Sequence, residues 1–426
     1  MTTDDGRWTT VVCRPSSIVF HGDFAMTHHF TTLALHAGYD ATTGGGLFPP
    51  LHMAVAYPFD SAERGQQMCL GEDPGFTYSR VANPTNDILE KRLAAMEGAE
   101  AGLAASSGLA AVFMAVLEVV QHKPNAEVVC SGRVYGNTKN QLRLTWTRLG
   151  VTPRFVDSPE DLSAWEAAIN DKTAIVYVES PSNPDVFVAD VKGLADLAHR
   201  HNLPLMIDST LATPAILRPL ALGADVVIHS TTKYLSGHSA ALGGAIIGRR
   251  DFVEGIRNGH YHFTGPTMSA FNAWLTLMGV ETLGLRMARA VSSAQQVAEY
   301  LAAHPKIKSV NYPGLPSHPQ HKLAMAQMGS GGTSLMSFVL DGGRREAWQV
   351  LESFKVILQA THLGSNQSVA VHPATTTHVR QPVEMRVAAG VVDGMIRLSV
   401  GLEEPDDLIG DLDQALKKFS IYQTGS

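Results

Sequence analysis

One lysine lies directly after three hydroxyl side chains, and these surroundings suggest chemistry. The segment HSTTKYLSGHSAALGG spans residues 229–244 and follows the apolar run ADVVI. An apolar run of this kind enters the interior of a protein, so Lys233 is poorly placed to reach solvent. A buried amine is costly unless a partner or a reaction uses it. The pattern therefore predicts that Lys233, with Ser230 and Thr232 beside it, takes part in a reaction.

Further polar residues follow neighbouring apolar strands. Asp208 ends the run PLMI, while Glu179 and Asn183 follow the run AIVYV. In open α/β sheets, ligands collect outside the carboxyl ends of the strands, so we expect these side chains near Lys233. Asp208 and Lys233 could equally form a structural ion pair, and their spacing leaves both interpretations open.

A third element suits a phosphate group. Ser106, Ser107 and Gly108 open the almost wholly apolar segment SSGLAAVFMAVLEVV, which predicts a buried helix. Small residues at a helix start leave backbone N–H groups free at the positive end of the helix dipole. A phosphate cup, an acid and a lysine are together the set that pyridoxal 5′-phosphate (PLP) needs.

The elements that position these residues alternate between helix and strand. We expect helices over 159–170 and 191–202, and strands over 173–180, 203–210, 224–230 and 243–248. This order favours an α/β fold with a mostly parallel sheet between helices. Longer helices and separated strands such as TSLMSFVL and MIRLSVG then indicate a smaller α+β domain. We expect an N-terminal arm (1–82), a large domain (83–283) and a C-terminal domain (284–426).

Composition limits the classes of partner. The 426 residues carry a net charge of −7 and no basic run, which disfavours nucleic acid and anionic membranes. No apolar stretch reaches the roughly 18 to 20 residues of a membrane span. Histidines 238, 372 and 378 lack metal-ligand spacing, so no metal is expected. The triple glycine at 44–46 has no dinucleotide-binding frame.

The N-terminal segment lacks the pattern of a secretory signal. It has no basic start followed by a long apolar run. We expect roughly the first 25 residues to be disordered or peripheral, and Met26 is an alternative start. The scattered cysteines 13, 69 and 130 form neither a disulfide framework nor a zinc cage. A reducing cytoplasm fits this usage.

Several ordered motifs resemble one known family. They are FTYSRVANPTNDILEKRLAAMEGAEAGLAASSGLAA, VYGNT, ESPSNP, HSTTKYLSGH, YPGL, HPATTTH and IRLSVGLEEPDDL, and they run from about residue 30 to 418. Together they resemble the Cys/Met-metabolism family of PLP enzymes, and methionine γ-lyase most of all. The resemblance implies the PLP-dependent transferase fold (fold type I, aspartate-aminotransferase-like).

The same resemblance assigns roles around the cofactor. Lys233 would bind PLP as a Schiff base and then move protons, and Asp208 would keep the pyridine nitrogen protonated. Tyr135 would stack on the ring and serve in proton transfer at the leaving group. The remaining cofactor contacts would come from Gly108, Leu109, Ser230, Thr232 and Asn183.

Other roles concern the substrate and a second subunit. Arg397 would grip the substrate carboxylate with its planar fork. In the family, the YSR segment of Tyr78 and Arg80 reaches the phosphate of the neighbouring subunit, and Tyr78 would also border the substrate. The resemblance thus implies active sites shared across a dimer interface and a homotetramer built from two such dimers.

The sequence departs from the family where the substituent on the substrate would lie. Asn137 stands where methionine γ-lyase has cysteine, Tyr261 and His262 replace a lysine–aspartate pair, and the usual Ser-Leu-Gly-(Asp/Gly) becomes His362 to Ser365. Asn366 and Gln367 follow, and Thr361 stands where cystathionine enzymes have glutamate. We expect a pocket rich in hydrogen-bonding groups, with Asn137 and His362 contacting the substrate.

The expected reaction is γ-elimination from an amino acid with a polar γ-substituent, yielding 2-oxobutanoate and ammonia. Canavanine, homoserine esters and homocysteine would suit such a pocket, because an unpaired buried polar group costs about 1–3 kcal/mol. The alternative is γ-replacement, as in O-acylhomoserine sulfhydrylase or cystathionine γ-synthase. A PLP-binding protein without turnover is a third, disfavoured hypothesis, because the reactive set is intact.

Overall fold

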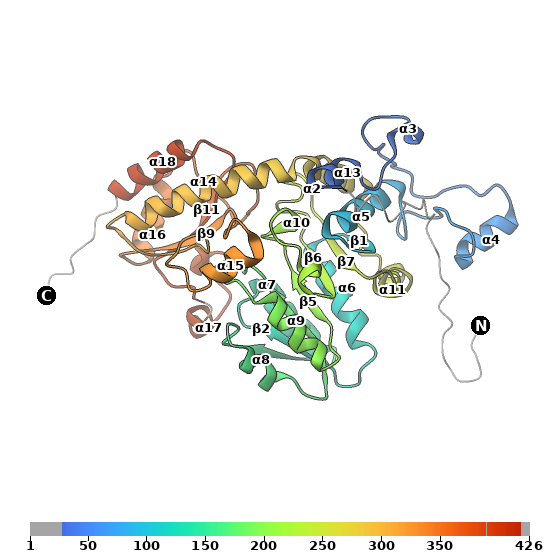
Figure 1. The fold of residues 1–426 in the computed structure, drawn as a ribbon, viewed down its shortest axis with the longest axis horizontal. Coiled ribbons are helices and arrows are strands. Elements are labelled where there is room, and N and C mark those ends of the chain that lie inside the picture. Colours follow the sequence, from blue (N-terminus) through green and yellow to red (C-terminus); the bar gives the residue numbers. More distant parts are fainter. Residues whose placement is uncertain (1–27, 389, 419–426) are drawn as a thin grey trace.

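The computed structural model describes residues 28–388 and 390–418. It contains two sheets, a seven-stranded one formed by the first part of the chain and a five-stranded one formed by the last (Figure 1). The prediction for the first 25 residues lies outside the described residues. The expected combination of a mostly parallel sheet with a smaller C-terminal α+β domain is confirmed.

The larger sheet has the strand order β1-β7-β6-β5-β4-β2-β3. Its pairs from β6 to β3 are parallel, while β7 runs antiparallel to both β1 and β6. The strands are β1 (Ala101–Ala105), β2 (Glu127–Ser131), β3 (Thr152–Val156), β4 (Thr173–Glu179), β5 (Leu205–Asp208), β6 (Val226–His229) and β7 (Gly244–Gly248).

Helices cover both faces of this sheet because its central strands are apolar up to the polar residues at their ends. All seven residues of β4 are buried, which is typical of a parallel sheet. Ile175 and Tyr177 pack into one apolar cluster, whereas Val176 and Val178 pack into another. The covering helices are α5 (Pro84–Glu97), α6 (Gly108–Val120), α8 (Leu162–Ala168), α9 (Val191–Arg200), α11 (Arg250–Ile256) and α13 (Ala270–Glu281).

Capping side chains mark where these helices start. Asp161 accepts a hydrogen bond from the Ser163 amide before α8, and Asp190 accepts one from the Gly193 amide before α9, both at 2.9 Å. Such caps satisfy backbone donors that a helix start leaves unpaired. Shorter helical segments are α7 (Gly136–Asn140), α10 (Thr213–Ile216) and α12 (His262–Thr264), with π-helical turns at Gln141–Trp146 and Arg257–Tyr261 and a 3-10 turn at Pro219–Leu222.

The smaller sheet has the order β10-β11-β12-β9-β8 and a core of its own. Only its β10–β11 pair is parallel. Its strands are β8 (Ile307–Asn311), β9 (Leu335–Leu340), β10 (Leu358–Gln359), β11 (Val369–Val371) and β12 (Met395–Ser399). Its helices are α14 (Leu283–Ala303), α15 (His321–Met328), α16 (Arg344–Ser353), α17 (Val383–Ala388) and α18 (Pro405–Lys418), with a 3-10 turn at Pro373–Thr375.

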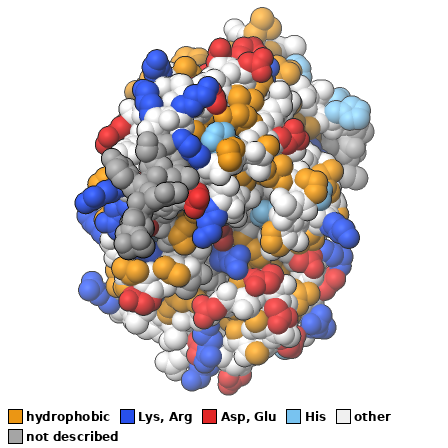
Figure 2. All heavy atoms as spheres, turned by 90° about the vertical axis from the view of Figure 1, so that its left-hand side faces the viewer, with side chains coloured by type: hydrophobic (Ala, Val, Ile, Leu, Met, Phe, Trp, Pro, Cys, Tyr) orange, Lys and Arg blue, Asp and Glu red, His pale blue; other side chains and the backbone are white. Residues whose placement is uncertain are grey.

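The long helix α14 connects the two parts, running from beside α2 and α13 near the top of Figure 1 to the C-terminal elements at its left. At the opposite end project α3 (Ala41–Gly44) and α4 (Ala62–Leu70), while α2 (Phe30–His36) packs on α5 and α13. Figure 2 shows the end with α16 and α18, where acidic and basic side chains are interspersed.

Candidate active site

Three neighbouring strands of the larger sheet end in the residues that the sequence singled out. Glu179 of β4 lies in register with Asp208 of β5, and Asp208 lies in register with Ile228 of β6. After β6 the chain turns, and the amide of Lys233 donates to the carbonyl of Ser230 at 3.2 Å. The structure therefore brings the predicted acid and the predicted lysine to one edge of the sheet.

Lys233 has an amine suited to nucleophilic attack. Burial, and then the nearby Arg397 cation, lower its pKa to about 8. Its Nζ lies 3.3 Å from Nδ1 of His362. Burial, followed by the charges of Lys233 and Arg397, lowers the pKa of His362 to about 4. His362 is therefore neutral at neutral pH, and its Nδ1 accepts the hydrogen bond from the amine.

Arg397 is a buried cation that lacks an anionic partner among the described residues. It lies on β12 with only 1% of its surface exposed, and burial lowers its pKa to about 10. Its Nη1 donates to Oδ1 of Asn183 at 3.1 Å, and its Nη2 donates to the carbonyl of His362 at 2.8 Å. Its Nε has no hydrogen-bond partner in the described part of the chain. A ligand carboxylate would satisfy both the charge and the unused donor.

Glu179 holds two of the predicted residues through their backbones. Its carboxylate accepts hydrogen bonds from the amide of Tyr135 at 2.5 Å and from the amide of Asn183 at 2.9 Å. Burial, and then repulsion from Asp208, raise the pKa of Glu179. The sequence placed Glu179 at this edge but gave it no role. Its only signal was a carboxylate at the end of an otherwise apolar strand.

Tyr135 and Asn137 face each other at the start of α7. The Nδ2 group of Asn137 donates to the hydroxyl oxygen of Tyr135 at 3.0 Å. Burial raises the pKa of Tyr135, while the hydrogen bond from Asn137 opposes this rise. Sequence reasoning had placed Asn137 against the substrate, and spacing alone gave no signal for its contact with Tyr135.

Asp208 is arranged to receive a positive charge. Its Oδ1 accepts from the amide and the hydroxyl of Thr210, at 3.1 and 2.6 Å. Burial raises its pKa, so the carboxylate would be stabilised by a cation. A protonated ring nitrogen has this property.

The predicted phosphate cup is formed by two segments in close contact. Ser107 caps α6 by accepting from the Ala110 amide at 3.2 Å, and the first amides of the helix, from Gly108 and Leu109, have no acceptor within it. A Cβ on Gly108 would lie 2.8 Å from the Cβ of Ser230, so only glycine permits this approach. The hydroxyl of Thr232 bonds to the backbone of Gly243.

These groups fit PLP in their chemistry. The cup offers the amides of Gly108 and Leu109 and the hydroxyl of Ser230 to a phosphate, Asp208 offers a carboxylate to a ring nitrogen, and Lys233 offers an amine to an aldehyde. The Thr232 hydroxyl, also expected at the phosphate, instead donates its hydrogen to the Gly243 carbonyl. Arg397 remains available for an amino-acid carboxylate.

Some predicted residues lie apart from this group. Tyr78 and Arg80 are exposed, with the guanidinium over the Tyr78 ring at 5.6 Å. Arg80 donates to the carbonyl of His262 and its own carbonyl accepts from Thr267. Tyr261, expected to enrich the pocket in polar groups, is instead buried in the core and donates to the Ala104 carbonyl at 2.8 Å. Its hydroxyl is satisfied there.

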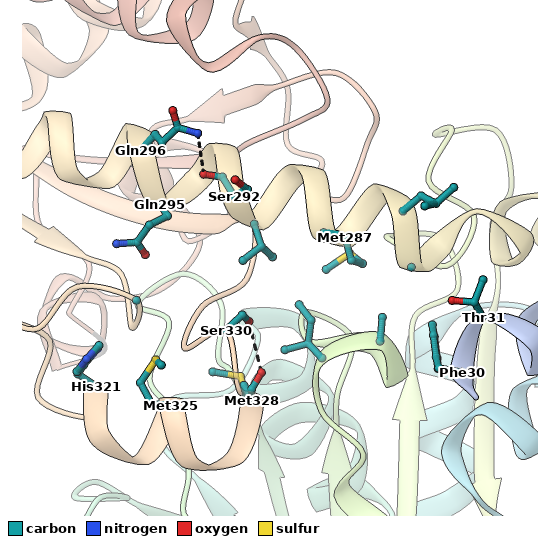
Figure 3. A pocket seen from close by; sticks show the side chains of 17 residues that line it. Phe30, Thr31, Met287, Ser292, Gln295, Gln296, His321, Met325, Met328 and Ser330 are labelled. Carbon is teal, nitrogen blue, oxygen red and sulfur yellow. Dashed lines mark hydrogen bonds between the residues drawn. The ribbon is translucent and has the colours of Figure 1, made fainter. Parts of the chain in front are cut away.

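A separate hollow of about 900 Å³ lies along α14 and faces α15 (Figure 3). Met287, Met325 and Met328 line it, and among the described residues on its wall His321 is the one titratable group. It contains none of the predicted site residues, so we assign the chemistry to the sheet edge. Within the described ranges, no cluster of His, Cys, Asp and Glu suits a metal, and no helix combines the length and apolar character needed to cross a membrane.

Comparisons with known proteins identify the family. The family model for Cys/Met metabolism PLP-dependent enzymes matches residues 31–417. The chain is 41% identical over 390 residues to L-methionine gamma-lyase of Pseudomonas putida, covering 91% of this chain and 97% of that one. It is also 41% identical over 389 residues to O-succinylhomoserine sulfhydrylase of Pseudomonas aeruginosa, covering 91% and 95%.

A solved structure adds the cofactor. The putative O-acetylhomoserine (thiol)-lyase of Campylobacter jejuni matches with a TM-score of 0.88 at 33% identity, over 92% of this chain and 100% of that one, and it carries a pyridoxyl group on a lysine. The predicted family, fold type I and covalent PLP cofactor are thereby confirmed. The chain belongs to the Cys/Met metabolism family of PLP-dependent enzymes.

Proposed function

We propose that this enzyme catalyses γ-elimination on a γ-substituted L-amino acid, releasing 2-oxobutanoate, ammonia and the protonated substituent. PLP would supply the electron sink. Lys233 would bind PLP and move protons at the substrate carbons, Asp208 would face the ring nitrogen, and Arg397 would bind the substrate carboxylate. Tyr135 would hold a proton for the leaving atom.

One observation carries this proposal. The side chain of His362 binds the Lys233 amine, and its carbonyl binds the Arg397 guanidinium. A single residue thus fixes the reactive amine beside the unpaired, buried cation. An amino acid held by its carboxylate on Arg397 would have its Cα near Lys233, as proton transfer at that carbon requires.

The polarity of the site supports a polar γ-substituent. Asn137 and His362 offer hydrogen-bonding groups around Tyr135 and Lys233. A thioether methyl would leave such groups without partners, whereas canavanine, homoserine esters and homocysteine carry polar atoms for them. Tyr261 does not contribute to this preference, because its hydroxyl is bonded in the core.

A panel of γ-substituted amino acids tests the reaction and the preference together. Purified enzyme loaded with PLP should form 2-oxobutanoate from canavanine, O-acetylhomoserine and homocysteine, with a higher kcat/KM than from methionine. Equal turnover of methionine would refute the polar pocket while leaving γ-elimination intact. No 2-oxobutanoate from any member of the panel would refute the proposed reaction.

A second candidate is γ-replacement. It is favoured by the 41% identity to O-succinylhomoserine sulfhydrylase, which equals the identity to the lyase. Incubating the enzyme with O-succinylhomoserine, with and without sulfide, separates the two. γ-Elimination predicts 2-oxobutanoate in both reactions, and γ-replacement predicts that sulfide diverts the product to homocysteine.

We further propose that the active site is completed by a second subunit through Tyr78 and Arg80, within a homotetramer. Two large apolar side chains beside contacts of this segment are exposed in the single chain: Met53 at 67%, next to the Ala54 carbonyl that binds Ser79, and Phe263 at 79%, next to the His262 carbonyl that binds Arg80. Exposed apolar area of this kind marks an interaction surface.

Mixing two inactive variants tests this sharing. If Arg80 serves the partner's site, an R80A subunit paired with a K233A subunit forms one site with both residues intact. Activity should then return after subunit exchange, up to about a quarter of the wild-type value for random pairing. Exchange shown by mass spectrometry without recovered activity would contradict the shared site.

A further inference from the structure

The contact between Asn137 and Tyr135 has a defined direction. The Asn137 amide donates to the Tyr135 hydroxyl oxygen, and among the described residues this is the only hydrogen bond of that hydroxyl. The phenolic O–H is therefore free to donate elsewhere. The backbone of Tyr135 is fixed by Glu179, so the direction of the free O–H depends on the Asn137 amide and on whatever the site binds.

This arrangement makes Tyr135 a proton donor. Burial keeps the phenol protonated at neutral pH, because it raises the pKa of Tyr135. A hydrogen bond donated to the phenol oxygen stabilises the negative charge that grows there as the proton departs. Hydrogen bonds in a row also strengthen one another. Asn137 therefore assists Tyr135 when it gives up its proton, and only then.

We propose that Asn137 is a positioning residue that acts through Tyr135, and that among the polar γ-substituents the pair favours those whose leaving atom is a basic oxygen. The inference rests on the proposed γ-elimination and narrows its substrate class. A carboxylate ester leaves as a stable anion and gains little from a proton donor. An ether, an aminooxy group or a thioether leaves as a strong base and gains much.

The proton and electron balance is simple. As the Cγ–X bond breaks, X takes the bonding electron pair and the proton of the Tyr135 hydroxyl, and leaves as HX. Lys233 takes the Cβ proton, and the electron pair of that broken C–H bond forms the Cβ–Cγ double bond. The phenolate that remains, stabilised by the Asn137 amide, regains a proton from water before the next turnover. Overall, substrate and one water give 2-oxobutanoate, ammonia and HX.

Three substrates of similar size separate this role from simple contact with the substrate. O-acetyl-L-homoserine releases acetate, S-ethyl-L-homocysteine releases ethanethiol, and O-ethyl-L-homoserine releases ethanol, so the basicity of the leaving atom rises in that order. The variants are N137A, which removes the donor, and N137D, which is nearly isosteric but presents an acceptor. Because N137D keeps the size and shape of the wild-type side chain, it tests the change from a neutral donor to a negatively charged acceptor without a change in packing.

The expected losses in kcat/KM grow with leaving-group basicity. For N137A we expect the smallest loss with the acetyl ester and, relative to that loss, a further decrease of about three- to tenfold with the ethyl ether, the size of one neutral hydrogen bond. For N137D we expect a loss about tenfold larger again with the ether, because a carboxylate accepts the phenolic proton and opposes its transfer. Equal losses on all three substrates in both variants would overturn the proposal.

A second measurement does not depend on turnover. With fluorotyrosine incorporated, the ¹⁹F resonance of Tyr135, assigned from the Y135F spectrum, reports its pKa in the holoenzyme. This pKa should rise from wild type to N137A and again to N137D. An unchanged pKa would overturn the proposal even if activity falls. If the wild-type enzyme forms 2-oxobutanoate from none of the three substrates, the γ-elimination itself is refuted.

Discussion

Two groups of residues in the site are held in different ways. The strand-end group, Asp208, Ser230 and Lys233, lies at the ends of adjacent strands of the larger sheet: backbone pairing places Asp208 beside Ile228, and the turn after β6 carries Ser230 and Lys233. The loop group, Asn137 and His362, lies on the short helix α7 and on the connection between β10 and β11, and side-chain hydrogen bonds hold it.

This difference in how residues are held matches a difference in their roles: the strand-end group carries the chemistry that the family shares, and the loop group contains the residues in which this chain departs from the family. A side chain placed by a sheet register cannot move unless the sheet changes, so the strand-end group suits the chemistry common to all PLP enzymes of this kind. A residue placed by one side-chain contact can be exchanged at little cost to the fold. We expect substitutions in the strand-end group to abolish the reaction, and substitutions in the loop group to change its selectivity.

The largest effect is expected at Lys233. K233A removes both the amine that binds PLP and the base that moves protons, so kcat/KM should fall by at least about 10⁴-fold. Absorbance of the purified protein should also lose the band of lysine-bound PLP. Full activity in K233A would contradict the assignment of the strand-end group, whatever the loop group does.

A smaller but still large effect is expected at Asp208. D208N keeps the acceptor for Thr210 but removes the charge facing the ring nitrogen. Loss of one partner from a buried charge pair costs about 2–5 kcal/mol, so kcat should fall by about 10² to 10³-fold. The melting temperature without PLP should not decrease, because burial raises the pKa of Asp208 and the ionised carboxylate gives the empty protein no stability. A large decrease would indicate a structural rather than a catalytic role.

Much of the strand-end group could be predicted from sequence. An apolar run of four or five residues that ends in Asp208 or leads to Lys233 fixes where the strand stops, and parallel strands place their ends at one edge. The five-stranded sheet was harder to outline, because β10 has two residues and β11 three. Their short apolar stretches carry no periodicity.

The loop group could be named but not placed. Asn137 and His362 were recognised as departures from the family. The contact of His362 with Lys233 joins positions 129 residues apart. Both this contact and that of Asn137 with Tyr135 depend on side-chain rotamers, which the sequence does not show. Tyr261 shows the limit of this reasoning. Its hydroxyl was expected in the pocket. It lies in the core instead, where it donates a hydrogen bond to the buried carbonyl of Ala104 in β1.

The pH dependence of PLP binding tests the environment of Lys233 without substrate. Only the neutral amine attacks an aldehyde, and the pKa of Lys233 is lowered to about 8. The rate constant for PLP uptake by cofactor-free protein should therefore rise by about two orders of magnitude from pH 6 to pH 9 and level off above pH 8. Stopped-flow absorbance measures it. A rate that still rises tenfold per pH unit beyond pH 9 would show an amine with its ordinary pKa.

The smallest effect is expected at His362, where the two groups meet. A full proton transfer from Lys233 to His362 is disfavoured, because their pKa values of about 8 and about 4 differ by about four units. His362 instead orients the amine as a neutral acceptor, worth about 0.5–1.5 kcal/mol. H362A should lower kcat by about three- to tenfold.

The matched variant is H362N, whose side-chain oxygen can take the place of Nδ1. It should recover most of the lost kcat, and the main-chain carbonyl that binds Arg397 remains in both variants. Equal defects in H362A and H362N would show that the ring acts by packing alone. A hundredfold loss of kcat in both variants would show that the reaction needs His362 as much as it needs the strand-end group. The distinction between the two groups would then not hold for the residue that contacts Lys233.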